Sequence, residues 1–246
     1  MKSKEEQGNV ILTGDTHGSF ERLSDFCMRF STRPSDVMVI LGDAGFNFWQ
    51  DERDRRRKEY VSGLPMTVFC VHGNHEIRPE RIPSYRLMQW RGGQVWAEDE
   101  FPNILFAKDG EIYRLNGKRV LVIGGAYSID KDLRLSAGYG WWEDEQPSDE
   151  IRQRVERRLE EENWCVDTVL THTVPLKYEP TECFLSCVDQ SRVDKSTEKW
   201  LDSIEDRLQY RNWFSGHYHV NKTVDRLTIL FDSYRELPPA GEEPYR

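Results

Sequence analysis

The sequence predicts a layered α/β protein that contains a mixed β-sheet. Early in the chain, short apolar runs that end at glycine alternate with amphipathic segments, which is typical of parallel strands and the helices that cover them. A two-residue turn signal, Asn116 and Gly117, lies between two later apolar runs and predicts a hairpin. The hairpin interrupts the alternation and adds antiparallel pairing, so we expect both kinds of strand neighbour.

The elements of the first half follow from the spacing of apolar residues. Residues 19–30 place Phe20, Leu23 and Phe26 on one face of a helix, together with Cys27 and Phe30. Residues 51–61 are charged and helix-like. Apolar runs predict buried strands at residues 9–13, 37–41, 66–71, 104–107, 111–115 and 118–123.

The second half alternates in the same way. Ser148 is expected to cap a helix whose apolar residues recur every four positions, at Ile151, Val155 and Leu159. Residues 197–210 form a second helix with an apolar stripe, and strands are expected at 167–170, 212–214 and 228–231. No long linker or repeat is visible, so we expect a single domain over residues 1–246. Its core spans about residues 8–235 and is followed by a ragged C-terminal tail.

Composition narrows the range of partners. Lys and Arg number 34 against 43 Asp and Glu, and the net charge of −9 disfavours extensive nucleic-acid binding, which needs a basic face. It leaves room for a small phosphate-bearing substrate. No apolar run approaches the roughly 20 residues that span a bilayer, and the N-terminus lacks the apolar region of a secretory signal. We therefore expect a cytoplasmic protein with reduced cysteines and no membrane partner.

Polar residues gather directly after five of the expected strands. Five of the six histidines lie in these clusters, which read GDTHG (14–18), GDAG (42–45), GNHE (73–76), THT (171–173) and GHYH (216–219). Ligands bind at the carboxyl ends of strands in open α/β sheets, so we expect these side chains to meet at one edge. One histidine at a strand end is usually structural, but this joint pattern of imidazole and carboxylate without thiolate suits a divalent metal.

Counting ligands predicts two metal ions. One set for the first ion is Asp15, His17, Asp43 and His219, and a set for the second is Asp43, Asn74, His172 and His217. Asp43 is the natural bridge because its two oxygens can hold two cations together. Cations about 3.5–4 Å apart share a water and lower its pKa, which yields a hydroxide for in-line attack on phosphorus. The same ions neutralise phosphate oxygens in the transition state.

The five motifs, in this order, resemble the calcineurin-like metallophosphoesterase superfamily. The resemblance implies a four-layer α/β sandwich, in which two mixed β-sheets are flanked by helices. It also implies a dinuclear centre of two divalent ions (Mn, Fe or Zn, with Mn the best suited to activity in vitro) and phosphoester hydrolysis. GDAGFNF, GGAYS and a Trp-Trp segment further resemble small bacterial and phage-type members.

The resemblance also assigns a catalytic role to His75, beside the bridging Asp43. In the family, the histidine at this place faces the substrate and acts as general acid to the leaving oxygen or contacts phosphate. Two nearby cations depress the pKa of an imidazole, so His75 needs a carboxylate or carbonyl partner to stay protonated. The phosphoprotein phosphatase branch has an Asp-Arg pair where Phe46 and Asn47 stand here, and this departure weakens the protein-phosphatase interpretation.

Two irregular stretches are candidates for the substrate pocket. Residues near the second motif and after the strand at 118–123 are candidate substrate contacts, namely Asn47, Trp49, Tyr127 and Arg134. The stretch from Ser128 to Trp142 is long and irregular, and it either forms a lid or packs its tryptophans beneath the next helix. Residues 173–187 form a second candidate wall.

These observations predict a dinuclear-metal-dependent phosphoester hydrolase that uses a metal-bridging hydroxide. The predicted substrate is a small-molecule or nucleotide phosphomonoester or phosphodiester. The alternative is a serine/threonine-type protein phosphatase. A nuclease is disfavoured by the acidic charge balance, and a non-catalytic interaction module is disfavoured because no ligand position is missing.

Overall fold

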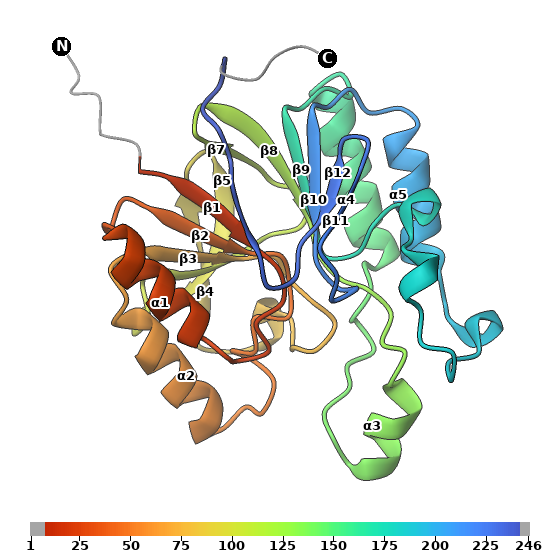
Figure 1. Ribbon diagram of the computed structural model, residues 1–246, viewed down its shortest axis with the longest axis horizontal. Coiled ribbons are helices and arrows are strands. Elements are labelled where there is room, and N and C mark those ends of the chain that lie inside the picture. Colours follow the sequence, from red (N-terminus) through yellow and green to blue (C-terminus); the bar gives the residue numbers. More distant parts are fainter. Residues whose placement is uncertain (1–7, 242–246) are drawn as a thin grey trace.

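Two β-sheets lie face to face in the computed structural model, which describes residues 8–241 (Figure 1). The first sheet has seven strands, in the order β13-β1-β2-β3-β6-β5-β4. Their bounds are β1 (Val10–Thr13), β2 (Val37–Ile40), β3 (Thr67–Cys70), β4 (Tyr85–Trp90), β5 (Gly93–Glu98), β6 (Ile104–Ala107) and β13 (Tyr234–Glu236). Strands β1, β2, β3 and β6 are parallel, whereas β13, β5 and β4 pair antiparallel.

The second sheet has six strands, in the order β11-β12-β10-β9-β8-β7. Their bounds are β7 (Ile112–Leu115), β8 (Lys118–Ile123), β9 (Thr168–Thr171), β10 (Asn212–Ser215), β11 (Lys222–Val224) and β12 (Leu227–Ile229). Strands β8, β9, β10 and β12 are parallel, while β7 and β11 pair antiparallel. Both sheets are therefore mixed.

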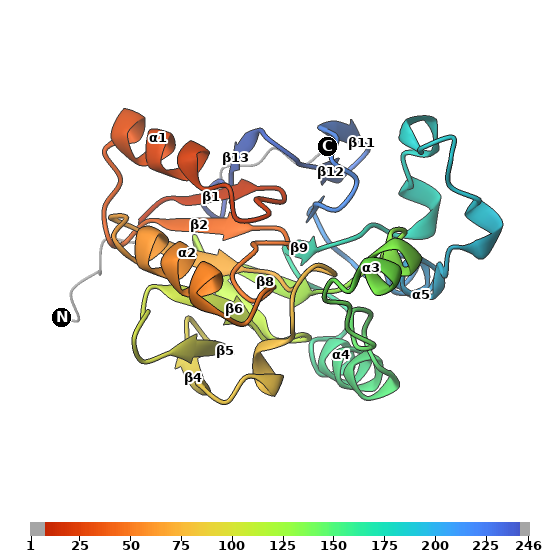
Figure 2. The same ribbon diagram turned by 90° about the horizontal axis from the view of Figure 1, so that it is seen from below.

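Helices cover the outer faces of the two sheets (Figures 1 and 2). Helices α1 (Glu21–Phe30) and α2 (Glu52–Ser62) flank the first sheet, and α4 (Asp149–Glu161) and α5 (Ser196–Glu205) flank the second. Helix α3 (Lys131–Ala137) stands off from these layers at the bottom of Figure 1. The remaining helical turns are 3₁₀ segments at Pro79–Arg81, Leu176–Tyr178, Thr181–Cys183 and Gln190–Arg192.

Three apolar clusters hold the layers together. The central cluster joins the inner faces of both sheets, with Leu12 and Val39 on one side and Leu170 and Phe214 on the other. A second cluster lies beneath α1 and α2, and a third lies beneath α4 and α5. Helices, sheet, sheet and helices thus form four layers, which confirms the predicted sandwich of two mixed sheets.

Two local predictions from the sequence, the hairpin turn and the helix cap, are confirmed. Asn116 and Gly117 both have positive φ, at 49° and 75°, as a tight β7–β8 hairpin requires. The Ser148 side chain accepts a hydrogen bond from the backbone N–H of Ile151, which confirms the predicted cap of α4. Asp51 similarly caps α2, by accepting from the backbone N–H of Arg53.

Several predicted boundaries were wrong. Helix α5 ends at Glu205, five residues before the predicted end at 210. The stretch from Ser128 to Trp142, expected to be irregular, contains α3. The hairpin β4–β5 was missed because most of β4 is exposed and carries no apolar run, and the short strands β11 and β13 were missed as well.

The predicted C-terminal tail is described as far as residue 241. Leu237, after the predicted core, is buried, and the backbone N–H of Ala240 donates to the carbonyl of Asn116. The rest of the predicted tail, from residue 242, lies outside the described residues. Across residues 8–241 no helix combines the length and apolarity needed to cross a membrane. The cytoplasmic location predicted from the sequence stays a prediction.

Candidate metal centre

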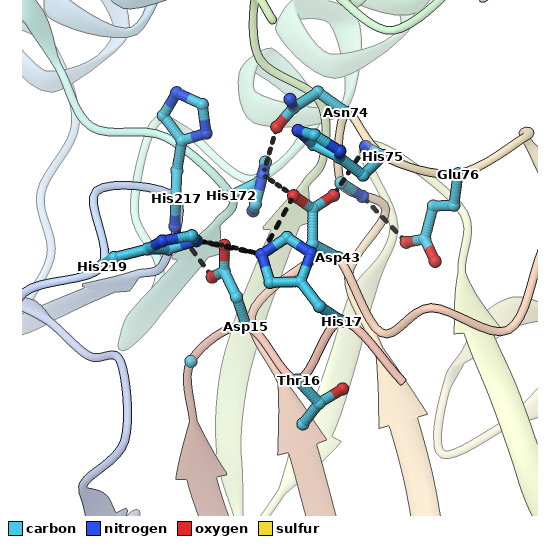
Figure 3. Close-up of polar contacts among 12 residues, drawn as sticks. Asp15, Thr16, His17, Asp43, Asn74, His75, Glu76, His172, His217 and His219 are labelled. Atoms are coloured by element: carbon cyan, nitrogen blue, oxygen red, sulfur yellow. Dashed lines mark hydrogen bonds and ion pairs between the residues drawn. The ribbon is translucent and has the colours of Figure 1, made fainter. Parts of the chain in front are cut away.

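The motif residues follow the carboxyl ends of β1, β2, β3, β9 and β10 and meet at one edge of the sandwich (Figure 3). Backbone hydrogen bonds join the loops there. The N–H of His17 donates to the carbonyl of Asp43 at 2.8 Å, and the N–H of Gly216 donates to the carbonyl of His172 at 2.9 Å. These two bonds join neighbouring loops within each sheet, and the backbone N–H of His217 donates to Oδ1 of Asp15 at 2.9 Å across the two sheets.

Four residues of this edge adopt left-handed backbone conformations. The φ angles are 47° at His17, 49° at Asp43, 69° at His217 and 52° at His219. Such conformations cost roughly 1–3 kcal/mol each in a non-glycine residue and cluster at functional sites. In a regular strand these side chains would alternate between the two faces of the sheet. The strained backbone directs them toward a common centre instead.

Two glycines allow the close approach of these loops. A Cβ atom on Gly42 would lie 2.0 Å from Nδ1 of His172, and a Cβ atom on Gly73 would lie 1.9 Å from Oδ1 of Asp43. Gly42 also has a φ of 101°, which L side chains rarely adopt. The sequence places glycine here because no side chain fits against the two donors.

The side-chain donors converge in three overlapping groups. In each group, one donor atom from every residue lies within 4.8 Å of the others. The groups are Asp15, His17 and His219; His17, Asp43 and His75; and Asp15, Asp43 and His172. Because Asp43 belongs to two groups and Asp15 to two, the carboxylates lie where neighbouring cation positions would meet.

The donor set fits a divalent cation. Oδ2 of Asp15 is buried and has no hydrogen-bond partner, which leaves a carboxylate oxygen for a ligand. Nδ1 of His172 lies 2.8 Å from the carbonyl of Leu41, so its Nε2 faces the centre, as in ligating histidines. Nδ2 of Asn74 donates to Oγ of Ser128, which turns the amide oxygen toward the same centre. Oxygen and imidazole donors without sulfur suit borderline-to-hard divalent ions.

Electrostatics within the cluster favours the charge states that a cation needs. Burial alone raises the pKa of Asp43, but the charge and hydrogen bond of His172 outweigh it and hold this pKa well below its usual range. Burial lowers the pKa of His172, yet Asp43 raises it to about 9. The pair thus consists of an ionised carboxylate beside a proton-bearing imidazole, and a bound cation would replace that proton. Burial and the charge of His172 lower the pKa of His217 to about 3, so this imidazole is neutral.

The predicted metal ligands do not all lie equally close. Asp15, His17, Asp43, His172 and His219 are in the convergent groups, and the amide oxygen of Asn74 is 2.8 Å from Nε2 of His172. The ring of His217 packs edge-on against that of His172, with centroids 5.0 Å apart, and in Figure 3 it points away from the Asp15–His219 pair. His75, expected to face the substrate, joins His17 and Asp43 as a possible donor.

A carboxylate lies near the His75 ring, but beyond hydrogen-bond distance. Nε2 of His75 lies 3.7 Å from Oδ1 of Asp130, and its backbone N–H donates to Oδ1 of Asp43 at 2.8 Å. Burial lowers the pKa of His75, while the nearby carboxylates of Asp43 and Asp130 oppose that shift. Sequence reasoning missed Asp130, although an acidic residue in the stretch from Ser128 to Trp142 was the available signal.

A cavity of about 380 Å³ opens over this centre. Tyr127, a predicted substrate contact, lines it, as do Ile129 and Asp130 from the stretch that begins at Ser128. The second predicted wall contributes Glu179, Cys183, Phe184 and Leu185. Both irregular stretches therefore border the space above the metal-ligand residues.

The other three predicted substrate contacts are not among the residues that line the cavity. Asn47 is buried and accepts a hydrogen bond from the Tyr85 hydroxyl, and the ring of Trp49 lies 3.6 Å beneath the Arg53 guanidinium. Arg134 is 3% exposed. Its guanidinium donates to the carbonyl of Gly140 and to Oγ of Ser128, the hydroxyl that orients Asn74, so it supports the centre from behind.

A double-sheet α/β sandwich with carboxylate and imidazole donors at one strand edge defines a class of protein, the metal-dependent phosphoester hydrolases. A family model for calcineurin-like phosphoesterases matches residues 8–221. The chain belongs to this family and is a hydrolase of phosphoester bonds.

Three solved structures resemble the chain at low sequence identity. A phosphopantetheinyl hydrolase from Mycobacterium tuberculosis aligns with a TM-score of 0.53 and 16% identity, over 98% of this chain and 99% of that one. A protein of unknown function from Aquifex aeolicus gives 0.34 and 16%, over 70% and 82%. A serine/threonine phosphatase from Saccharomyces cerevisiae gives 0.32 and 12%, over 93% and 68%. No curated protein sequence matches the chain.

Proposed function

We propose that this chain hydrolyses a small-molecule or nucleotide phosphoester with two divalent cations of manganese, iron or zinc type. One observation carries the proposal, namely that three donor groups overlap through the shared carboxylates of Asp15 and Asp43. The first cation is assigned to Asp15, His17, Asp43 and His219. The second is assigned to Asp43, Asn74, His172 and His217.

The position of Asp43 supports its assignment as the bridge. Its Oδ2 lies 3.6 Å from Nε2 of His172 and 4.0 Å from Nε2 of His17, so one oxygen faces donors of both sets. Its other oxygen, Oδ1, already accepts from the backbone N–H of His75, which fixes the carboxylate plane. Asn74 contributes a neutral amide, so the second set carries less negative charge than the first.

Side chains of the protein have the remaining roles in the proposed hydrolysis. When bound, the two cations supply an acidified water as nucleophile and positive charge for the phosphate oxygens. His75 lines the cavity beside Asp43 and is placed to donate a proton or hydrogen bond to the leaving oxygen. Asp130, 3.7 Å from its Nε2, orients that ring. Ser128 and Arg134 keep Asn74 in place from behind.

The proposal is tested with purified protein that is stripped of metal and reloaded with Mn²⁺. The substrates are para-nitrophenyl phosphate and its bis ester, and bound metal is measured on the same samples. We expect Asp43→Asn to lose bound metal and at least about 100-fold in kcat/KM, because it removes the shared anionic ligand. Asp99→Asn is the matched control, since the Asp99 side chain is 80% exposed and pairs with Arg86 at the surface.

Full activity and full metal content in Asp43→Asn would refute the proposal. A wider panel then separates the substrate classes. It compares nucleotides, phosphopeptides and phosphopantetheinyl compounds, the last chosen because the neighbour from Mycobacterium tuberculosis is named for them. A clear preference for phosphopeptides would overturn the small-molecule assignment in favour of a protein phosphatase.

A further inference from the structure

The cavity extends beyond the metal-ligand residues to a wall of different chemistry. This wall, called the Glu198 wall below, consists of Glu179, Phe184, Leu185, Glu198 and Tyr218. Phe184 and Tyr218 stack with their ring centroids 6.0 Å apart, and Ile129 adds apolar surface to the same cavity. A ligand bound in the cavity therefore meets both aromatic surface and carboxylates.

Glu198 is the most unusual member of the wall. It lies in the first turn of α5 and is 4% exposed. Its Oε1 accepts a hydrogen bond from Oγ1 of Thr173 at 2.7 Å, whereas its Oε2 is buried without any hydrogen-bond partner. A buried carboxylate oxygen without a donor is costly, so a cavity that Glu198 lines is suited to a ligand that brings one.

The charges that line the cavity are all negative in the described part of the chain. No Lys or Arg lines it, while Asp43, Asp130, Glu179 and Glu198 do. Lys195 pairs with Glu179 at 2.7 Å and lies outside the lining, so no Lys or Arg of the described residues stands beside Glu198 on the cavity surface. Metal ions at the strand edge would offset the carboxylate of Asp43 there, and the Glu198 wall would remain unfavourable to a second anion.

The wall is one residue away from the metal-ligand side chains along the chain. Thr173, which holds Glu198, directly follows His172, and Tyr218 lies between His217 and His219. Because Glu198, Tyr218 and several histidines of the centre line the same cavity, a phosphate at the metal centre would have space for its organic group beside the wall. The wall thus stands where the leaving group of a bound phosphoester would lie.

We propose that the Glu198 wall binds the leaving group and selects an uncharged alcohol with an apolar stem and an N–H donor, such as an amide. This specificity rests on the proposed phosphoester hydrolysis. Phe184, Leu185 and Ile129 pack against the apolar stem, and Oε2 of Glu198 accepts the N–H. Leaving groups that carry a carboxylate or further phosphates are disfavoured by Glu179 and Glu198.

The test compares matched phosphomonoesters with the Mn²⁺-loaded protein at about pH 8.5, where the Glu198 carboxyl is ionised although burial raises its pKa to about 7. The phosphate of N-hexanoylethanolamine carries an amide N–H, and the phosphate of 2-hydroxyethyl hexanoate replaces that N–H with an ester oxygen. We expect kcat/KM to be at least about tenfold higher for the amide, since a hydrogen bond to a carboxylate is worth at least that factor. A third compound, the amide with a terminal carboxylate, and AMP should both fall at least about tenfold below it.

Substitutions test which side chains cause the preference for the amide. Glu198→Gln presents an amide N–H to the cavity in place of an acceptor, so the ratio of amide to ester should fall to within about twofold. Glu160→Gln, an exposed position on α4, is the matched control and should keep the wild-type ratio. Because Glu198 is buried, circular dichroism checks folding. Phe184→Ala provides a second test, since it should reduce the preference for hexanoyl over acetyl chains.

The outcomes distinguish the two levels of the proposal. If neither para-nitrophenyl phosphate nor any other phosphoester is cleaved, the proposed function fails and this specificity fails with it. If para-nitrophenyl phosphate is cleaved but the wild-type protein treats amide and ester alike, only the role of the Glu198 wall is overturned. A higher rate on AMP than on the amide would overturn it as well.

Discussion

Glu198 should make the stability of this protein depend on pH in a way that one substitution removes. Burial raises the pKa of Glu198 from 4.5 to about 7. The nearby Glu179 adds to the shift, while the hydroxyl of Thr173 and the charge of Lys195 oppose it. The unfolded chain releases this proton near its ordinary pKa, so between these values only the folded state retains it. The stabilising contribution is fully present below about pH 4.5 and is lost as the pH rises through about 7.

The size of the effect follows from the shift. Each pKa unit corresponds to about 1.4 kcal/mol, so moving this carboxyl from 4.5 to about 7 costs the folded state about 3 kcal/mol at alkaline pH. Glu198→Gln has no proton to lose. We therefore expect the variant to gain about 3 kcal/mol of unfolding free energy relative to wild type between about pH 4.5 and about pH 9.

Urea denaturation of metal-free wild-type and variant protein across this range measures the difference directly. All other titrating groups are common to both proteins, so their contributions cancel in the comparison. Glu160→Gln, whose side chain is exposed, should give a curve parallel to wild type. Parallel curves for Glu198→Gln and wild type would show that the buried carboxyl does not retain its proton, and the reasoning would be wrong.

Two further substitutions, one of them with a matched control, test the framework around the centre. Gly42→Ala should abolish phosphoester hydrolysis and lower stability by at least about 2 kcal/mol, because its Cβ would lie 2.0 Å from Nδ1 of His172 at a φ of 101°. Activity and urea denaturation on the same samples check this. Arg78→Met should cost about 3–5 kcal/mol, because it leaves the buried carboxylate of Asp109 unpaired. Arg86→Met breaks an exposed ion pair and should cost less than about 1 kcal/mol by the same denaturation measurement.

The predictable parts of the fold are those whose apolar pattern is local. Strands such as β2 and β9 are buried along their whole length, so an apolar run before a turn was enough to find them. Four of the six residues of β4 are exposed, and its partner β5 alternates, so their pairing depends on the neighbouring β6 rather than on their own composition. Helix α3 was not predicted for a similar reason, because Arg134 is its one buried residue.

The residues of the candidate site also differ in whether their position could be predicted from the sequence. The convergence of the candidate metal ligands was predictable because each follows a strand end, and strand ends of parallel sheets meet by topology. Asp130 and Glu198 come from a loop and from a helix that carry no such signal, and only tertiary packing brings them to the cavity. Trp49 and Arg134 were predicted as substrate contacts from their chemistry, but residue type does not fix the direction of a side chain, and neither lines the cavity.

Because the metal centre and the Glu198 wall share neighbouring residues, few substitutions can change one without changing the other. Thr173 and Tyr218 are covalent neighbours of metal-ligand residues, so replacing either one disturbs the centre together with the wall. Glu198 is joined to the centre through the hydroxyl of Thr173, which donates a hydrogen bond to its Oε1. A substitution there changes which leaving groups are accepted while the donors of the metal centre, fixed by backbone bonds such as that from His17 to Asp43, stay where the fold puts them. Specificity and metal binding are therefore separable at this one side chain.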